Sequence, residues 1–392
     1  METVATTWVL YELTGSAVLV GLNGVFRAVP FLLLTPFAGA LADRIDQRRL
    51  LLVTQSLGML NSLVLGLLVL SGAAQPWHIY AQTVLQTAVT AFDITGRQAM
   101  FPRLVARRHI QAAVTLNSTA ARSAGFVGPA IAGWLIIGVG NAAPFLANAA
   151  SFLMLIGMLL LMRDRGRPAR AAATFRAEVL EGLRYVARSP LLSGILKLEA
   201  SVAVFSVNPA ILATFAREVL HTGADGLGVL LSALAFGALL GNGLLLSFAS
   251  VRRKGRLILA GGGLYATCVL GLAGTSTLAA AAALLVVAGM GDSAISSMRQ
   301  AALHLTARPA MRGRTVAAMV TVRRGLQPFS QTQSGVVAGL LGAPIALGIA
   351  GVAMLGAVIL AATRGTALRD FTSDQEIDIT DDDDAALDLR AI

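Results

Sequence analysis

Apolar stretches of about 20 residues recur along almost the whole chain, and this recurrence constrains the fold more than any other feature. About 20 helical residues cross the ~30 Å hydrocarbon core of a bilayer, where only helices and closed barrels satisfy their own backbone hydrogen bonds. A shorter apolar segment at residues 4–13 precedes the full-length ones. We therefore expect an all-α membrane protein with 12 transmembrane helices, the first truncated at the N-terminus by a mis-assigned start or a shortened copy. The full-length stretches are residues 17–41, 50–70, 77–100, 112–139, 143–162, 191–215, 226–248, 257–274, 278–298, 316–341 and 344–362.

The composition supports a membrane protein and offers no enzyme chemistry. Hydrophobic residues make up 56% of the chain and charged residues only 13%, which excludes a water-soluble domain. The single cysteine, Cys268, lies in an apolar stretch, and the four histidines lack the spacing of metal ligands. The sequence has no glycine-rich phosphate loop followed by Lys-Ser/Thr. We expect no enzymatic activity, no cofactor and no metal, with a proton gradient as the energy source.

Basic residues are concentrated in alternate loops. By the positive-inside rule these loops face the cytoplasm, which also places the C-terminus there. The net charge of +10 is then a sign of topology rather than of nucleic-acid binding, and the basic loops have membrane lipids as neighbours. The preference for arginine over lysine favours a bacterial inner membrane as the location. The basic loops are residues 44–49, 103–108, 163–170, 252–256, 308–314 and 364–369.

A short internal repeat indicates that the chain consists of two related halves. The triplet Arg97-Gln98-Ala99 recurs as Arg299-Gln300-Ala301, and Arg122 recurs as Arg324 at the same offset of 202 residues. These positions fall at equivalent places in two sets of six spans. Duplicated six-helix bundles are typical of one class of transporter.

The basic segment at residues 163–190 separates the two sets of spans. Its second half, residues 178–188, has the apolar spacing of an amphipathic helix, which predicts a linker along the inner membrane surface. Beyond residue 369 the composition becomes strongly acidic, which predicts a disordered cytoplasmic tail. The expected domains are an N-terminal transmembrane bundle at residues 1–162, the linker at 163–190, a C-terminal transmembrane bundle at 191–369 and the acidic tail at 370–392.

The loop between the second and third spans has a high density of charge. It has to emerge into water, so we expect the two spans to turn sharply at a glycine and the loop to act as a latch. Its pattern over residues 41–49, Leu-Ala-Asp-Arg-x-Asp-x-Arg-Arg, resembles the signature loop of the major facilitator superfamily, in its drug-efflux and enterobactin-exporter-like branch. Asp46 stands where a second glycine is usual, and Gln47 where many members have a basic residue. The residues expected to form this latch are Gly39, Asp43, Arg44, Asp46, Arg48 and Arg49.

A second motif lies in the fifth span, where Gly125, Gly128, Pro129 and Gly133 occur within nine residues. Small residues allow a neighbouring helix to approach closely, and a proline bends its helix. The segment resembles the antiporter motif of exporting members of the superfamily, with Ala132 in place of one glycine. The alternative is ordinary small-residue packing without a transport role.

The fourth span carries a polar stripe. Gln82, Gln86, Thr90, Asp93 and Arg97 follow one another at steps of three or four residues, so they share one helix face. Such a face inside a membrane is expected to line a water-filled passage. We expect Asp93 and Arg97 to pair with each other and with the signature loop as a cytoplasmic gate. A static structural pair is the alternative.

Other ionisable residues within the spans are candidates for the substrate and proton pathway, because each is costly in lipid. Arg27 either anchors an anionic or polar substrate or orients helices through an internal contact. Burial favours the neutral form of a carboxyl group, so Glu199, Asp292 and Asp93 are candidate proton carriers. The remaining candidates are Arg122 and Arg324.

The resemblance implies a secondary active transporter with two pseudo-symmetric six-helix bundles around a central cavity. We expect a monomer that exports a small, moderately hydrophobic compound, drug-like or siderophore-like, in exchange for protons by alternating access. The alternatives are an importer or uniporter of a small nutrient and a transport-inactive truncated homologue. Substrate identity does not follow from the sequence.

Overall fold

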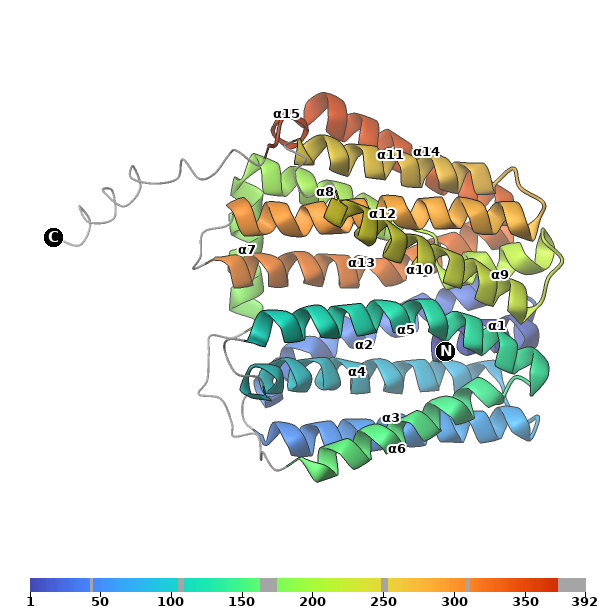
Figure 1. Cartoon of the computed structure of the whole chain (residues 1–392). Helices are drawn as coiled ribbons and strands as arrows, with labels where there is room; N and C mark the ends of the chain where they lie inside the picture. Colours follow the sequence, from blue (N-terminus) through green and yellow to red (C-terminus); the bar gives the residue numbers. More distant parts are fainter. Residues whose placement is uncertain (43–44, 105–108, 163–174, 248–252, 307–310, 373–392) are drawn as a thin grey trace.

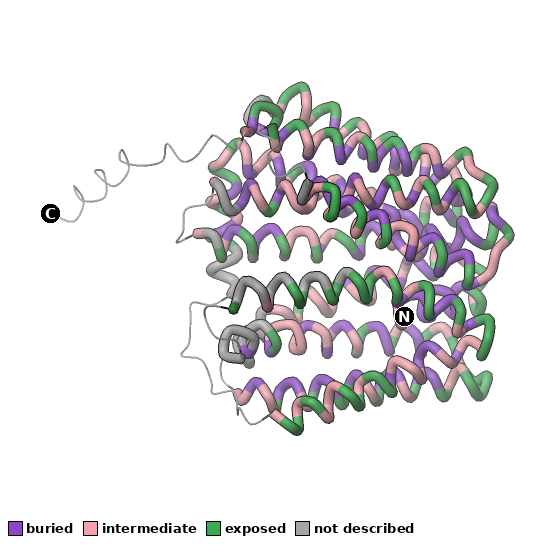
Figure 2. The backbone as a smooth tube through the Cα atoms, in the orientation of Figure 1, coloured by how far each residue is buried: buried purple, intermediate pink, exposed green. Residues whose placement is uncertain are grey.

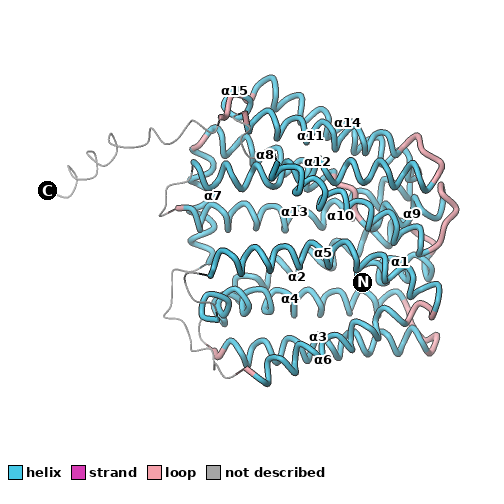
Figure 3. The backbone as a smooth tube through the Cα atoms, viewed as in Figure 1, coloured by secondary structure: helices cyan, strands magenta, loops and turns pink. Residues whose placement is uncertain are grey.

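The computed structural model describes residues 1–42, 45–104, 109–162, 175–247, 253–306 and 311–372, and within these ranges the chain is helical with no strand (Figures 1 and 3). Because apolar stretches of spanning length alternate with short loops, the helices run back and forth as one bundle. In chain order they are α1 (Glu2–Thr14), α2 (Ala17–Ala42), α3 (Gln47–Leu70), α4 (Pro76–Leu104), α5 (Ile110–Gly138), α6 (Ala143–Leu161), α7 (Phe175–Arg188), α8 (Pro190–Phe205), α9 (Pro209–Glu218), α10 (Ala224–Ser247), α11 (Lys254–Leu272), α12 (Leu278–Thr306), α13 (Arg312–Leu341), α14 (Ala343–Arg364) and α15 (Thr366–Arg369).

Most of the expected spans correspond to single helices. Eight segments of the described chain are long and apolar enough to cross a membrane by length and composition. The helices α4, α5 and α13 fall outside this group, and in α5 only Ser123–Gly138 forms a shorter apolar helix. Many large apolar side chains are exposed, as hydrocarbon contact requires. Exposed and buried residues alternate along the helices (Figure 2).

The span expected at residues 191–215 is present as the candidate span Pro190–Glu218, which is broken between α8 and α9. Pro209 disfavours helical geometry in the residue before it, and Asn208 is extended, with φ −137° and ψ 165°. The Asn208 Oδ1 atom accepts hydrogen bonds from the backbone N–H groups of Ala210 and Ile211, which caps α9. Its Nδ2 atom donates to the Oγ atoms of Ser330 and Ser334 on α13, at 3.0 and 2.8 Å. The break is therefore a built feature with its polar groups satisfied.

Equivalent helices pack in the same way in the two halves. In the first half α3 packs against α4 and α6, and α2 packs against α4. In the second half α11 packs against α12 and α14, and α10 packs against α12. This correspondence agrees with two pseudo-symmetric bundles. The helix α7 packs on α13 and α8 and lies across one end of the bundle (Figure 1).

The ends of the bundle are distinguished by their charge. We call the end where α2 finishes and α3 starts the basic end, because Arg48 and Arg49 lie there, and the opposite end the distal end. The exact domain boundaries stay predictions, because residues 163–174 and 373–392 lie outside the described residues.

The two halves contact each other closely near the distal end. They meet through α2 against α13 and through α5 against α10. A Cβ atom added to Gly21 would lie 2.8 Å from the Cα atom of Gly335, and one added to Gly133 would lie 2.8 Å from the carbonyl oxygen of Ala224. The Tyr11 hydroxyl also donates to Glu218 Oε1 at 2.9 Å, joining α1 to α9. Glycine at these positions lets the helix backbones touch, which closes the distal end.

The signature loop differs from the expected turn. Gly39 lies inside α2, three residues before its end, so the chain does not turn there. Asp46 is the N-cap of α3 and accepts hydrogen bonds from the backbone N–H groups of Arg48 and Arg49 at 2.8 and 3.2 Å. The Arg48 guanidinium donates to the carbonyls of Leu159 and Leu160 at the end of α6, both at 2.7 Å. Arg48 therefore stabilises the C-terminus of α6 in this structure.

Replacing Asp46 by alanine is expected to lower the free energy of unfolding by about 1 kcal/mol, because two N–H groups of α3 lose their acceptor. Thermal unfolding of the protein in detergent measures this effect. The matched control is Asp46→Asn, which removes the charge but keeps a capping oxygen. Equal losses in the two variants would indicate that the charge, and not the cap, stabilises this end of α3.

Candidate functional site

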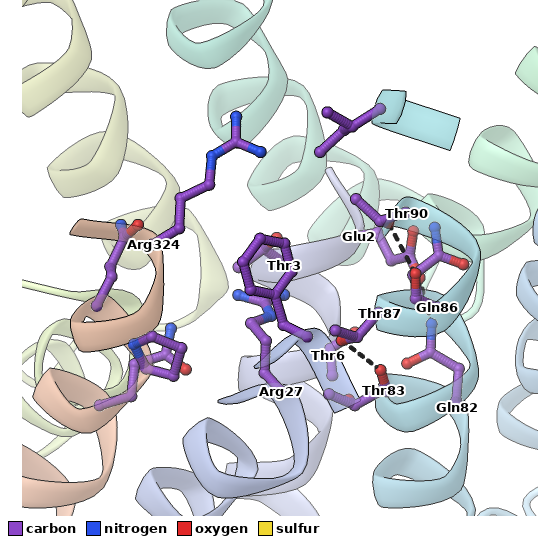
Figure 4. A pocket seen from close by; sticks show the side chains of 15 residues that line it. Glu2, Thr3, Thr6, Arg27, Gln82, Thr83, Gln86, Thr87, Thr90 and Arg324 are labelled. Carbon is purple, nitrogen blue, oxygen red and sulfur yellow. Dashed lines mark hydrogen bonds between the residues drawn. The ribbon is translucent and has the colours of Figure 1, made fainter. Parts of the chain in front are cut away.

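A cavity of about 440 Å³ lies between the two halves (Figure 4). Its volume falls in the range of small-molecule sites, about 300–1,000 Å³. Only three of its fifteen lining residues, Phe31, Ile94 and Pro328, have wholly apolar side chains. The cavity is thus richer in polar groups than the moderately hydrophobic substrate expected from the sequence would require. The polar lining consists of Glu2, Thr3, Thr6, Arg27, Gln82, Thr83, Gln86, Thr87, Thr90, Arg324, Gln327 and Gln331.

The polar stripe of α4 forms one wall of this cavity. Gln82, Gln86 and Thr90 line it, as the spacing of the sequence predicts. The stripe is supported from behind, because Asn61 of α3 donates from Nδ2 to the carbonyl oxygen of Gln82 and to Gln86 Oε1, at 3.1 and 3.2 Å. Buried amides that hold one another in this way fix the positions of the wall residues.

The two candidate arginines approach the cavity from different halves. Arg27 comes from α2 and Arg324 from α13, and Figure 4 shows Arg324 across the cavity from the threonines of α4. Arg27 is partly buried, and Arg324 is exposed. Among the described salt bridges, none involves either arginine. Their guanidinium groups are therefore available to a ligand. Each guanidinium group can donate up to five hydrogen bonds.

Glu2 is the cavity residue that the sequence reading missed. It begins α1, two residues ahead of the apolar segment that the sequence predicts from residue 4. Its carboxylate accepts hydrogen bonds from Gln82 Nε2 and, at 2.9 Å, from Asn148 Nδ2. A usable signal was present, since Glu2 and Thr6 are four residues apart and share a helix face.

Asp93 and Arg97 lie on the same helix as the cavity wall, closer to the basic end. The Arg97 Nε atom is 2.8 Å from Asp93 Oδ2, so the expected pair is present within α4. Gln55 of α3 donates from Nε2 to Asp93 Oδ1 at 2.5 Å. The Arg97 side chain is 53% exposed. Their predicted partners Asp43 and Arg44 lie outside the described residues, and their role as a gate stays a prediction.

Glu199 and Asp292 lie outside the cavity lining. Glu199 of α8 is buried and forms an ion pair with Arg299 of α12, while Arg323 Nη1 of α13 is 3.7 Å from the same carboxylate oxygen. This cluster connects three helices of the second half. Asp292 is partly buried on α12 and forms none of the described salt bridges.

Two glycines of the antiporter-like motif, Gly133 and Gly125, differ in how closely they are packed. Near the distal end Gly133 packs against α10, where it faces Gly228. Two turns earlier, a Cβ atom added to Gly125 would meet nothing within 4 Å. The neighbouring Phe126 nevertheless stays in contact with α10, because its carbonyl accepts from Ser232 Oγ at 3.0 Å and its ring centroid is 5.3 Å from that of Phe236. The two halves therefore touch along the motif, while Gly125 itself faces open space. Gly128 and Pro129 lie between these positions within α5, while the side chain of Arg122 is outside the described part of the chain.

No group of three or more His, Cys, Asp or Glu residues within the described ranges is placed to hold a metal ion. The arrangement provides instead a polar cavity shared by two bundles that touch at one end. Such a site can bind a small molecule and expose it when the bundles move.

The chain matches the family of transmembrane secretion effectors over residues 1–387. Similar curated proteins include the staphyloferrin A transporter of Staphylococcus aureus, 31% identical over 158 residues, which are 40% of this chain and 40% of that protein. The multidrug efflux pump Tap of Mycolicibacterium fortuitum is 26% identical over 249 residues, 61% of this chain and 60% of Tap. The enterobactin exporter EntS of Salmonella typhimurium is 27% identical over 232 residues, 58% of this chain and 52% of EntS. Each of these alignments covers less than two thirds of the relative's own length.

Solved structures with the same fold include the nucleoside transporter NupG, with a TM-score of 0.70 and 11% identity over 93% of this chain and 94% of that one. Another is a bacterial homologue of the human lysosomal transporter Spinster in an inward-facing, unoccupied conformation. It has a TM-score of 0.68 and 14% identity, covering 94% of this chain and 91% of that one. At these identities the likeness concerns the fold alone.

Proposed function

The chain belongs to the transmembrane secretion effectors of the major facilitator superfamily and is a multi-pass membrane transporter, not an enzyme; from this premise we propose that it exports a small molecule in exchange for protons. The observation that carries the proposal is the cavity between the halves, with side chains from α1, α2 and α4 on one side and α13 on the other. A site built from both halves changes whenever the halves move relative to each other. Alternating access requires this property.

The contact between the two halves near the distal end supports alternating access. The halves are in close contact near the distal end through glycines of α2, α5, α10 and α13. Farther toward the basic end, Arg324 lines the cavity and is exposed. If the basic loops face the cytoplasm, as the positive-inside rule indicates, this arrangement is the inward-facing state, ready to accept a compound from the cell.

Export rather than import is supported by the antiporter-like motif and by the names of the relatives, which include an efflux pump and a siderophore exporter. The absence of an ATP-binding motif in the sequence favours an ion gradient as the energy source. The carboxyl groups proposed to carry protons are Asp93, Asp292 and Glu199, together with Glu2 at the cavity itself. We further propose that the protein works as a monomer in a bacterial inner membrane, with its C-terminus in the cytoplasm.

Everted membrane vesicles test the direction and the coupling. A lumen made acidic should drive ethidium, tetracycline or citrate into the vesicles through the protein, and a protonophore should abolish the accumulation. Loss of the probe from acidified vesicles would indicate an importer, and movement without a gradient would indicate a uniporter. The absence of movement for every probe would favour a transport-inactive homologue.

Replacing Asp93 by asparagine is expected to reduce coupled export while the protein stays folded. The Arg97 side of this i,i+4 ion pair is 53% exposed, and such pairs contribute only about 0.3–0.5 kcal/mol to stability. Asparagine also keeps an oxygen that can accept from Gln55, so the protein should stay folded. A gate that couples two conformations typically contributes about 1–3 kcal/mol, so export should fall about 5- to 150-fold. The initial rate of export into everted vesicles measures this.

The control for Asp93→Asn is Asp370→Asn, which removes an exposed carboxylate next to α15, outside the predicted gate. Equal rates in wild type and Asp93→Asn would contradict the gate. A similar loss in both variants would indicate a general effect of charge at the basic end.

A further inference from the structure

The charged side chains that line the central cavity carry more positive than negative charge. Arg27 and Arg324 contribute two positive charges from the two halves, and Glu2 contributes one negative charge. Among the described salt bridges, none joins Glu2 to either arginine. A cavity with an excess of positive charge and low-dielectric walls attracts anions.

Glu2 is fixed to the wall of the first half. Gln82 donates to its Oε1 atom, and Asn148 Nδ2 donates to its Oε2 atom at 2.9 Å. Asn148 is itself fixed by Ser62 Oγ of α3, 2.8 Å away. Both Glu2 oxygens thus accept an amide N–H, as a carboxylate does, and Glu2 lines the same cavity as Arg27. It therefore acts as an internal anion that offsets part of the attraction of Arg27 for a ligand.

The threonines of α4 give the opposite wall a different chemistry. The Thr87 hydroxyl donates to the carbonyl of Thr83, and the Thr90 hydroxyl donates to the carbonyl of Gln86, both at 2.7 Å (Figure 4). Each hydroxyl has one proton, so these threonines offer the cavity only their lone pairs. One side of the cavity thus donates through arginine, and the other accepts through threonine.

We propose that Arg27 and Arg324 together bind the carboxylate of a small organic acid that also bears hydroxyl or amide N–H groups, and that Glu2 opposes this binding as an internal anion. The proposal rests on the proposed function, in which this cavity is the transport site. A planar carboxylate suits two guanidinium groups, because each can donate in a bidentate manner. The ligand's own donors then meet the threonine acceptors. Since the arginines belong to different halves, a bound carboxylate also links the two bundles.

Calorimetric titration of the full chain purified in detergent tests this. The probes are citrate, tricarballylate, which has the same carboxylates without the hydroxyl, and the lipophilic cation tetraphenylphosphonium. We expect saturable citrate binding, weaker tricarballylate binding and no binding of the cation. Arg324→Gln should weaken citrate binding about tenfold or more, because it removes charge-assisted hydrogen bonds. Glu2→Gln should strengthen it several-fold, a change that a folding defect does not produce.

The matched control is Arg364→Gln, which removes an exposed arginine at the end of α14, outside the cavity lining. Its citrate affinity should equal that of the wild type. An absence of citrate binding, unchanged affinity in Arg324→Gln, or unchanged or weaker affinity in Glu2→Gln would overturn the proposal. Equal affinities for citrate and tricarballylate would overturn the proposal that the threonines accept a hydrogen bond from the ligand's hydroxyl group.

These outcomes separate the proposal from the proposed function. Proton-coupled movement of ethidium in vesicles, without citrate binding, would leave export standing and remove the anionic substrate class. Citrate binding with the expected variant effects, but without proton-coupled movement of any probe, would remove proton-coupled export. It would leave the binding of an organic acid in the cavity standing.

Discussion

Replacing Glu199 by glutamine is expected to destabilise the protein by about 3–5 kcal/mol, because it leaves buried guanidinium charge without a counter-ion. The Glu199 side chain is only 6% exposed and that of Arg299 only 9%. The Oε1 atom of Glu199 is shared between Arg299 and Arg323. The Oε2 atom of Glu199 has no hydrogen-bond partner among the described groups. Without the carboxylate, the two arginines would repel each other across α12 and α13.

Thermal unfolding in detergent, followed by light scattering and size exclusion, measures the loss. The double variant Glu199→Met with Arg299→Met is the informative control, because removing both members of a buried pair is often neutral when apolar groups take their place. Arg323 is 38% exposed, so water can solvate it in that variant. We expect the double variant to recover most of the stability. An unchanged melting temperature in Glu199→Gln alone would contradict a structural ion pair.

Replacing Gly133 by leucine is expected to prevent closure of the distal end and to abolish export. A Cβ atom at this position would already lie 2.8 Å from the Ala224 carbonyl oxygen and 3.3 Å from the Gly228 Cα atom. Overpacking of this kind typically costs about 1–3 kcal/mol. At the upper limit, the population of the closed state would fall about 150-fold. The control is Gly125→Leu in the same motif, where the added side chain has open space.

Accessibility to a membrane-impermeant maleimide measures the conformational change directly. The chain has one cysteine, so a Cys268→Ser background with Thr87→Cys places a single thiol in the cavity. In Gly133→Leu this thiol should become reactive from the distal side. In Gly125→Leu the same thiol should react as it does in the Cys268→Ser, Thr87→Cys protein without a glycine substitution. Unaltered export in Gly133→Leu would show that the glycine contact is not needed for transport.

The membrane fold could be predicted from the sequence because hydrocarbon imposes its constraints segment by segment. The length of each apolar stretch and the spacing of polar residues on α4 require no knowledge of distant contacts. The same rule would have found the polar face of α13, where Arg324, Gln327 and Gln331 follow at steps of three and four. The resemblance of the signature loop supplied the superfamily.

The contacts of individual charges could not be predicted in this way. The sequence places Asp46 and Arg48 in one charged loop, but their partners depend on helix ends. Asp46 caps α3, and Arg48 reaches carbonyls of α6 that are 111 and 112 residues away in the chain. Glu199 likewise finds its partners on α12 and α13. Such pairings depend on how helices are placed in three dimensions, which local patterns do not encode.

The interruption at Asn208 has a mechanical consequence. A continuous helix transmits a tilt at one membrane surface to the other, whereas two segments joined by an extended residue can pivot separately. Here both segments are fastened to α13 at the break, α9 through Asn208 and α8 through the carbonyl of its C-cap Ser206, which accepts from Ser330 Oγ at 2.9 Å. A change in the angle between α8 and α9 therefore acts directly on α13, which lines the cavity.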